Sequence, residues 1–260
     1  MSADAYYRAI SGVLGRIHDQ EASKLEAAGE MLAEAIASGK RVYLFGSGHS
    51  VIPVMDVFPR YGSFVGFFPL YDPRLMWHNV VGPGGARELL WLERREGYVE
   101  QFLQSYSFTP GDCIIVFSHG GLNAAPIEAA LYAKARGVKV ITVSSHANRE
   151  LNQATHSSGK QLADVADIAL DNCVAAEDSQ VDIGRREKVA AGSTMAVVFI
   201  AMALVAETGA RLAARGFVAP TFVSPNVPGV EKDHNLGVFE AYTAKWFERG
   251  PAPHGAAHKA

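Results

Sequence analysis

The sequence predicts an α/β protein in which helices cover both faces of a parallel β-sheet. Five short apolar runs follow one another along the chain, and segments with helical periodicity separate them. The runs are residues 42–45, 64–68, 113–117, 138–143 and 167–170. They are largely apolar rather than alternating with polar residues, which indicates strands buried on both faces. Alternation of such strands with helices predicts three layers, with the sheet in the middle.

Helices are predicted before, between and after these strands. Residues 5–18 and 20–38 carry apolar side chains at helical spacing, and Gly39 follows the second segment as a stop signal. The clearest later helices are 123–136 and 193–215. The second of these is apolar on most of its surface, so it is buried either within the chain or by a partner subunit.

The length of the chain fits one large domain. We expect this domain to cover residues 1–249, with N-terminal helices in 1–40, an α/β core in 41–220 and a C-terminal segment in 221–249. Two prolines and two glycines in 250–260 predict a flexible tail.

Composition and charge argue against several functional classes. The formal net charge of −3 gives no sign of a nucleic-acid surface. The longest uncharged apolar run, 195–206, is too short to span a bilayer, and the N-terminus lacks the pattern of a signal peptide. Cys113 and Cys173 form neither a disulfide framework nor a metal-ligand spacing. We therefore expect a cytoplasmic protein with no nucleic-acid or membrane partner.

Small polar residues and glycines follow three of the predicted strands. They occupy the loops 46–50 (Gly-Ser-Gly-His-Ser), 118–123 (Ser-His-Gly-Gly-Leu-Asn) and 144–146 (Ser-Ser-His). Ligands of open α/β sheets bind outside the carboxyl ends of the strands. Glycine lets a ligand approach the backbone, and exposed N–H groups with serine hydroxyls suit a phosphate. One such loop is equally explained as a turn with a serine cap, but repetition at three strand ends favours an anion cradle.

The spacing of the first loop disfavours two nucleotide-binding motifs. Val51 stands where the third glycine of Gly-x-Gly-x-x-Gly is needed, and no Gly-Lys-Ser/Thr follows as in a P-loop. A dinucleotide or a nucleoside triphosphate is therefore not the expected ligand.

These segments resemble the SIS (sugar isomerase) domain family over roughly residues 40–220. The resemblance is carried by residues 42–50, 112–128 and 133–144. Residues 156–162, Asp171-Asn172, Ser193-Thr194 and 224–229 are similar to an uncharacterised, phosphoheptose-isomerase-like branch, and N-acetylmuramic acid 6-phosphate etherase is a more distant relative. The resemblance implies a five-stranded parallel sheet of flavodoxin-like order. It also implies a homodimer whose site lies at the subunit interface and holds a sugar phosphate in the first two loops.

Carried over residue by residue, the resemblance implies phosphate contacts in both loops. The contacts are Ser47 and Ser50 in the first loop, and Ser118, Gly121 and Asn123 in the second. The family pattern Ser-x-Ser-Gly reads Ser118-His119-Gly120-Gly121 here, so one phosphate hydroxyl is absent and His119 is a candidate replacement donor. The other candidate substrate contacts are Gly46, Gly48, Arg60, Ser144, Ser145, Lys160, Ser193 and Thr194.

Aldose–ketose isomerisation needs a base for a carbon-bound proton and a group that moves a hydroxyl proton. A carboxylate and a histidine suit these two tasks. The segment 87–97 resembles the one that supplies a catalytic glutamate in the family, and we predict Glu93 as the base, with Glu88 and Glu96 as competitors. A solvated helix face with charge pairs would also explain these residues.

The candidate catalytic histidines are His49, His78 and His234, the last reaching a neighbouring subunit by analogy with the family. No histidine pair has the spacing of zinc ligands on one helix, so no metal or other cofactor is expected. The predicted function is isomerisation of a phosphorylated sugar through an enediol. Etherase-type elimination and amino-sugar-phosphate deamination use the same proton abstraction and stay open, as does a non-catalytic sugar-phosphate sensor.

Overall fold

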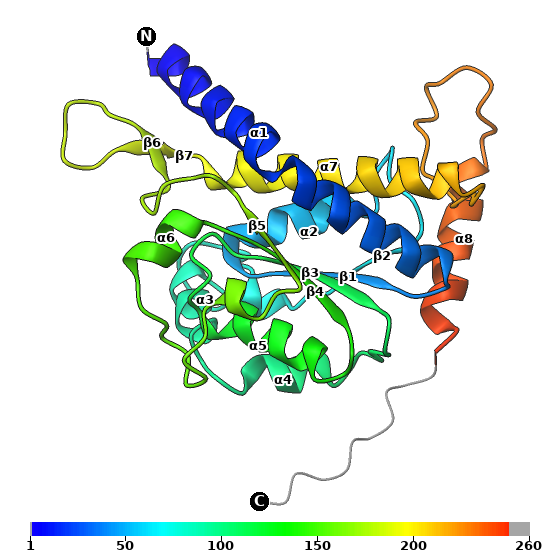
Figure 1. Cartoon of the computed structure of the whole chain (residues 1–260), viewed down its shortest axis with the longest axis horizontal. Coiled ribbons are helices and arrows are strands. Elements are labelled where there is room, and N and C mark those ends of the chain that lie inside the picture. The colour runs from blue at the N-terminus through cyan, green and yellow to red at the C-terminus, as the bar shows by residue number, and fades with distance from the viewer. Residues whose placement is uncertain (1, 250–260) are drawn as a thin grey trace, which may run out of the picture.

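The computed structural model describes residues 2–249 (Figure 1). The predicted tail, 250–260, lies outside these residues. Five parallel strands form the central sheet in the order β2-β1-β3-β4-β5. They are β1 (Val42–Gly46), β2 (Phe67–Pro69), β3 (Cys113–Phe117), β4 (Lys139–Ser144) and β5 (Ile168–Asp171). The predicted α/β class, the five strands and the flavodoxin-like order are thereby confirmed.

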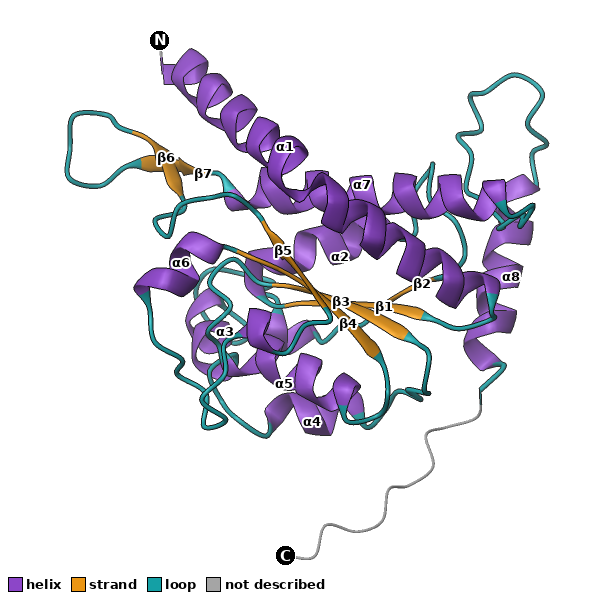
Figure 2. Ribbon diagram, in the orientation of Figure 1, coloured by secondary structure: helices purple, strands orange, loops and turns teal. Residues whose placement is uncertain are grey.

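Helices form a layer on each face of the sheet (Figures 1 and 2). One layer holds α1 (Ser2–Ala37), α2 (Val51–Val57) and α7 (Ser193–Ala214), and the other holds α3 (Ala86–Leu92), α4 (Tyr98–Leu103) and α5 (Ala124–Lys134). Successive side chains of the buried strands point to opposite faces of the sheet, so each strand contributes to both hydrophobic cores. Val42 and Leu44 pack with α1 and α7, whereas Tyr43 and Phe45 pack on the side of α4 and α5.

The register of the sheet brings the three polar loops to one edge. Gly46 pairs with Phe117, and Phe117 pairs with Val143, so β1, β3 and β4 end side by side. Asp171, at the end of β5, pairs with Ser144 at the end of β4. The residues that follow these four strands therefore lie next to one another.

The two predicted N-terminal helices form the single helix α1. The apolar pattern is interrupted at His18, Asp19 and Gln20, which are all exposed. This stretch contains neither glycine nor proline, so nothing ends the helix and the polar side chains face solvent.

The remaining elements surround the sheet. They are the short helices η1 (Gly48–Ser50), η2 (Pro73–Leu75), α6 (His146–Leu151) and η3 (Leu162–Asp164), the strands β6 (Ser179–Val181) and β7 (Val189–Ala191), and the helix α8 (His234–Phe247). Strands β6 and β7 form an antiparallel ribbon that extends away from the sheet (Figure 2). The ribbon is not predicted by the sequence analysis, because each strand has only three residues.

Helix α7 is, by length and composition alone, long and apolar enough to cross a membrane. The uncharged run 195–206, which the sequence analysis judged too short, covers only part of this helix. In the structure α7 packs along α1 and against α2, and Ile200 and Leu204 belong to the core. It therefore has the surroundings of a core helix. Its outer side is not covered by the described chain: Met195 is 47% exposed, and Phe199 and Met202 are partly exposed.

Candidate functional site

The first loop folds back tightly against the end of β1. A side chain at Gly46 would place its Cβ 2.1 Å from the Ser50 carbonyl oxygen, so only glycine fits there. Gly48 has a φ of +60°, a conformation that favours glycine. This geometry turns the chain directly from β1 into η1 and α2 and places Ser47 and Ser50 at the carboxyl edge of the sheet.

Glu93 reaches this loop from the end of α3. The Ser47 hydroxyl donates to Glu93 Oε2 at 2.9 Å, and the Glu93 side chain is buried. Removal from water raises the pKa of this carboxyl, and the hydrogen bond from Ser47 and the charge of Arg94 offset part of the rise. The Ala125 N–H donates to the Glu93 carbonyl oxygen at 3.0 Å, which ties the same residue to the first turn of α5. Glu93 is therefore not on a solvated helix face.

The competing carboxylates have other partners. Glu88 is exposed and accepts from the Gly84 N–H at 2.9 Å, before the start of α3. Glu96 accepts from the Ser157 N–H at 2.8 Å and from the Ser157 hydroxyl, and these hydrogen bonds lower its pKa. Of the three glutamates, Glu93 is the one that contacts the first loop.

The second loop is held by its own backbone and by α6. The Gly121 N–H donates to the Ser118 hydroxyl at 3.1 Å, and Gly121 has a φ of +64°. Asn148 donates its amide to the Gly120 carbonyl oxygen at 2.6 Å. Asn123 precedes α5 without forming a side-chain cap. A Cβ added at Gly120 would be 3.6 Å from Asn148 Nδ2, so the position has room for the serine of the family pattern.

The third loop is mainly structural. The Ser145 hydroxyl donates to the Val174 carbonyl oxygen at 2.6 Å and accepts from the Asn148 N–H at 3.1 Å, which caps α6. Its hydrogen is therefore engaged within the protein. Ser144 is buried, and its hydroxyl lies 3.6 Å from the position of a Cβ on Gly121.

The three predicted catalytic histidines lie at different places. His49 is exposed in the first loop, and its ring contacts Trp77 edge-on at 4.5 Å. His78 is exposed in the loop before α3, where its backbone N–H donates to the Gly84 carbonyl oxygen. His234 begins α8, and its Nε2 lies 2.9 Å from the Thr221 carbonyl oxygen.

Thr221 in turn bridges to Phe64, which precedes β2 and so lies at the amino edge of the sheet. The described chain therefore does not bring His234 to the loops at the carboxyl edge.

The other predicted substrate contacts also lie at different places in the structure. Arg60 is exposed and forms an ion pair with Asp56 at 2.6 Å. Ser193 donates to Asp178 at 2.8 Å, and Asp178 also accepts from the N–H groups of Gly192 and Ser193. The acceptor at the start of α7 is thus Asp178 rather than Ser193. Helix α7, in which Thr194 is the second residue, contacts η1 of the first loop.

Lys160 is exposed, and the loop that contains it is hydrogen-bonded to the second loop. The Thr155 hydroxyl donates to the Leu122 carbonyl oxygen at 2.7 Å. His156 Nε2 lies 3.8 Å from Glu96 and 3.9 Å from Glu128. The segment from Thr155 to Lys160 therefore joins the second loop to α4 and α5.

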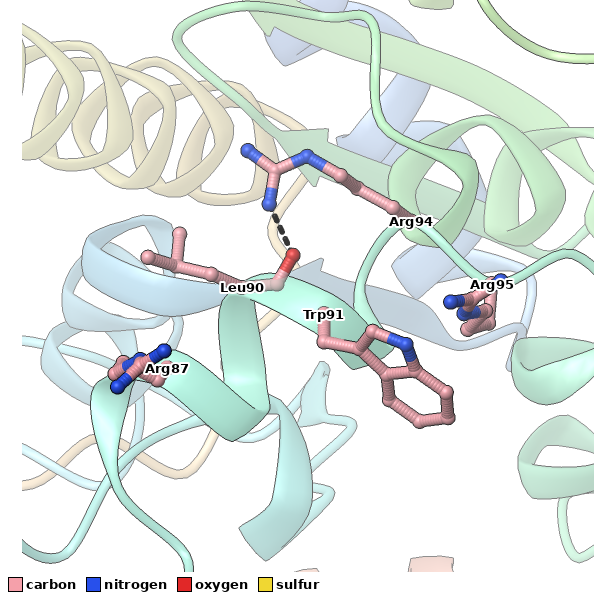
Figure 3. A pocket seen from close by; sticks show the side chains of 5 residues that line it. All are labelled: Arg87, Leu90, Trp91, Arg94 and Arg95. Atoms are coloured by element: carbon pink, nitrogen blue, oxygen red, sulfur yellow. Dashed lines mark hydrogen bonds between the residues drawn. The ribbon is translucent and has the colours of Figure 1, made fainter. Parts of the chain in front are cut away.

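The exposed side of α3 lines a hollow of about 550 Å³ (Figure 3). Its residues are Arg87, Leu90, Trp91, Arg94 and Arg95. Arg94 turns back to donate to the Leu90 carbonyl oxygen, and the Arg95 guanidinium lies 4.4 Å from the centre of the Trp91 ring. Within residues 2–249 none of the three arginines pairs with a carboxylate. The hollow is therefore lined by three positively charged side chains.

Several residues near the loops were not predicted as site residues. Asn172 bonds to His119, and His146 lies 4.0 Å from Asp171. Two signals were present in the sequence: the pair Asp171-Asn172 is part of the resemblance to the SIS domain, and His146 belongs to the polar loop 144–146. Among residues 2–249, no group of three His, Cys, Asp or Glu side chains could hold a metal ion.

A family model described as SIS domain matches residues 5–145. The chain belongs to the SIS domain family, as the resemblance implied. It is 34% identical over 250 residues to a UPF0309 protein of Streptomyces coelicolor, covering 95% of this chain and 97% of the relative. It is 32% identical over 243 residues to a UPF0309 protein of Caldanaerobacter subterraneus subsp. tengcongensis, covering 92% and 96%. Within the SIS domain family it is thus a member of the UPF0309 family.

Solved structures of low sequence identity share the fold. A phosphoheptose isomerase of Neisseria gonorrhoeae superimposes with a TM-score of 0.51 at 13% identity, covering 80% of this chain and 97% of the other. One from Francisella tularensis gives a TM-score of 0.50 at 12% identity, covering 80% and 96%. This similarity confirms the SIS-like arrangement of the sheet and helices.

Proposed function

We propose that this protein binds a phosphorylated sugar in the loops after β1 and β3 and isomerises it through an enediol, with Glu93 as the base. One observation carries the proposal: Glu93 is a buried carboxyl, hydrogen-bonded to Ser47, at the edge of the sheet where α/β proteins bind ligands. The raised pKa of Glu93 makes its carboxylate a better proton acceptor than an exposed one.

We propose the following roles for the other residues of the loops. The Ser50 and Ser118 hydroxyls and backbone N–H groups of the first two loops hold the phosphate, while the Ser47 hydroxyl donates to Glu93. Glu93 takes the proton from the carbon next to the carbonyl and returns it to the neighbouring carbon. His49 is exposed at the same loop and moves the hydroxyl proton.

We propose that the protein acts as a homodimer. The outer side of α7 and the adjoining α2 expose Met195, Ile52 and Met55, by 47%, 37% and 53%. Apolar side chains gathered on two packed helices favour cover by a second copy. His234 is then available to the neighbouring subunit's site. Met195→Glu is expected to shift the chain to monomers in sedimentation analysis, and an unchanged mass would contradict the role of this surface.

The proposed binding is tested by thermal shift with a panel of sugar phosphates, each beside its unphosphorylated sugar. A ligand that binds only the native state raises the melting temperature by mass action. We expect stabilisation by phosphorylated members alone. Equal shifts with free sugars, or none with any phosphate, would reject phosphate recognition.

The proposed base is tested with the best ligand of that panel. Glu93→Gln is expected to lower turnover by at least about a hundredfold while the sugar phosphate still binds. Glu88→Gln is the matched control, because this competing glutamate lies on the same helix but contacts Gly84 instead of the first loop. Loss of turnover in the control, or full activity of Glu93→Gln, would remove Glu93 from the mechanism.

Two alternatives give different results in the same assay. Elimination or deamination releases a leaving group or ammonia, whereas an enediol route incorporates solvent deuterium into the isomerised sugar. A sensor binds the sugar phosphate without any turnover.

A further inference from the structure

His119 occupies the second loop at the position just before the missing hydroxyl. Its ring reaches across the end of β4, because the loop follows β3 while its partner, Asn172, follows β5. His119 Nδ1 lies 3.1 Å from Asn172 Nδ2. The ring therefore lies at the carboxyl edge of the sheet, where the ligand is expected.

The hydrogen bonds around Asn172 determine where the proton of His119 is. Asn172 Oδ1 accepts from the Val174 N–H at 3.0 Å, and a backbone N–H can only donate. The Asn172 amide is thereby oriented, with its NH2 group toward His119. Since that NH2 group is also only a donor, His119 Nδ1 must accept and carries no hydrogen. The single proton of the neutral ring is then on Nε2.

This arrangement is well supported by its surroundings. Asn172 is fully buried, and its N–H donates to the Ser144 carbonyl oxygen at 3.0 Å. The next residue, Cys173, has a φ of +54°, which is uncommon for a residue other than glycine and lets Val174 turn back to Asn172. The Ser145 hydroxyl, which donates to the Val174 carbonyl oxygen, holds the far side of this turn. A hydrogen on Nδ1 would face the Asn172 NH2 group with a second donor, so the contact with Asn172 selects the tautomer that carries its hydrogen on Nε2.

The Nε2 atom has no hydrogen-bond partner. It is buried and unpaired within the described chain, although the residue as a whole is partly exposed. Buried polar atoms are rarely left without a partner, and an exception beside a binding site is explained when a ligand supplies one. An N–H donor needs an acceptor oxygen, which phosphates, carbonyls and hydroxyls of a sugar phosphate all provide.

We propose that His119, held by Asn172 in the tautomer with its hydrogen on Nε2, donates a hydrogen bond to an oxyanion of the substrate and replaces the hydroxyl that Gly120 lacks. This inference rests on the proposed sugar-phosphate binding. His119 acts as a fixed donor, not as the base, because its proton-free nitrogen is occupied by Asn172. Asn172 is a positioning residue, which acts on the substrate only through His119.

The first test is spectroscopic and needs no substrate. Long-range ¹H–¹⁵N correlation of the imidazole rings distinguishes which nitrogen carries the proton. We expect His119 to show Nε2–H with a proton-free Nδ1, and Asn172→Asp to protonate Nδ1, because a carboxylate oxygen replaces the NH2 donor while the Val174 bond is kept. A ring protonated on Nδ1 in the unsubstituted protein, or an unchanged pattern in Asn172→Asp, would overturn the role of Asn172.

The second test uses two replacements of His119 itself. The amide nitrogen of Gln reaches about as far as Nε2, whereas that of Asn reaches only as far as Nδ1. His119→Asn is expected to weaken binding of the best sugar phosphate by about tenfold or more, which is the effect of losing one hydrogen bond to a charged group. His119→Gln, which keeps a donor at this distance, is expected to weaken it by no more than about threefold. Circular dichroism checks that both variants fold.

The outcomes separate this inference from the proposed function. Equal affinities of the two variants and the unsubstituted protein would overturn the donor role and leave sugar-phosphate binding intact. If no sugar phosphate binds, inorganic phosphate is titrated while the His119 signals are followed. A shift of the Nε2 signal supports the contact even though the proposed substrate class fails, and the absence of any shift overturns it.

Discussion

Gly120→Ser restores the hydroxyl of the family pattern in the second loop, and the structure indicates that the fold accepts it. The nearest atom to an added Cβ is Asn148 Nδ2 at 3.6 Å, an ordinary contact, and Gly120 is not among the residues with positive φ. We therefore expect the free energy of unfolding to change by no more than about 0.5 kcal/mol. Gly121→Ser is the contrasting variant. Its φ of +64° strains any side chain, and we expect it to destabilise the protein by about 1 kcal/mol or more.

The gain in binding follows from one new hydrogen bond. A hydroxyl that donates to a phosphate contributes about 1.5–3 kcal/mol, which corresponds to an affinity increase of about 10-fold to 150-fold. Isothermal titration of the unsubstituted protein and Gly120→Ser with the same sugar phosphate measures the ratio, and the unphosphorylated sugar serves as the control ligand. An equal or weaker affinity of a folded Gly120→Ser protein would refute a second phosphate contact at this position beside that of His119.

Three further outcomes are expected. Glu93→Gln should raise the melting temperature by about 2–4 °C at neutral pH and by little in acid. The pKa of Glu93 is raised in the folded state, so the folded protein loses stability as pH rises through that pKa, and glutamine has no proton to lose. Asp178→Ala should lower stability by about 1 kcal/mol in chemical denaturation, because it removes the acceptor at the start of α7. The protection factor of the Ser157 amide, which is its exchange rate corrected for the intrinsic pH dependence of exchange, should fall as pH falls through the lowered pKa of Glu96. Protonation weakens the carboxylate acceptor, and a protection factor that does not change with pH would contradict this.

The strands and the ligand edge were predictable because their signals are local. A run such as 113–117 is apolar throughout because both faces are covered, and the Gly-Ser-Gly turn after β1 reflects a place where only glycine fits. The prediction of Glu93 as the base depended only on the resemblance. Its partner Ser47 is 46 residues away, and no periodicity connects the two. The single helix α1 was missed because an interrupted apolar pattern does not by itself end a helix.

What the sequence could not supply is the pairing of side chains from loops far apart in the chain. Asp178, which lies just before β6 and 15 residues before Ser193, accepts a hydrogen bond from the Ser193 hydroxyl at the start of α7. Asn172 meets His119 across 53 residues, because β4 lies between β3 and β5 in the sheet. Neither pair has a spacing rule, since the separation depends on loop lengths rather than on a helical or strand period. The position of the His119 proton depends on one further contact, the Val174 N–H. The chemical character of this site is therefore set by tertiary hydrogen bonds, while its location is set by strand order.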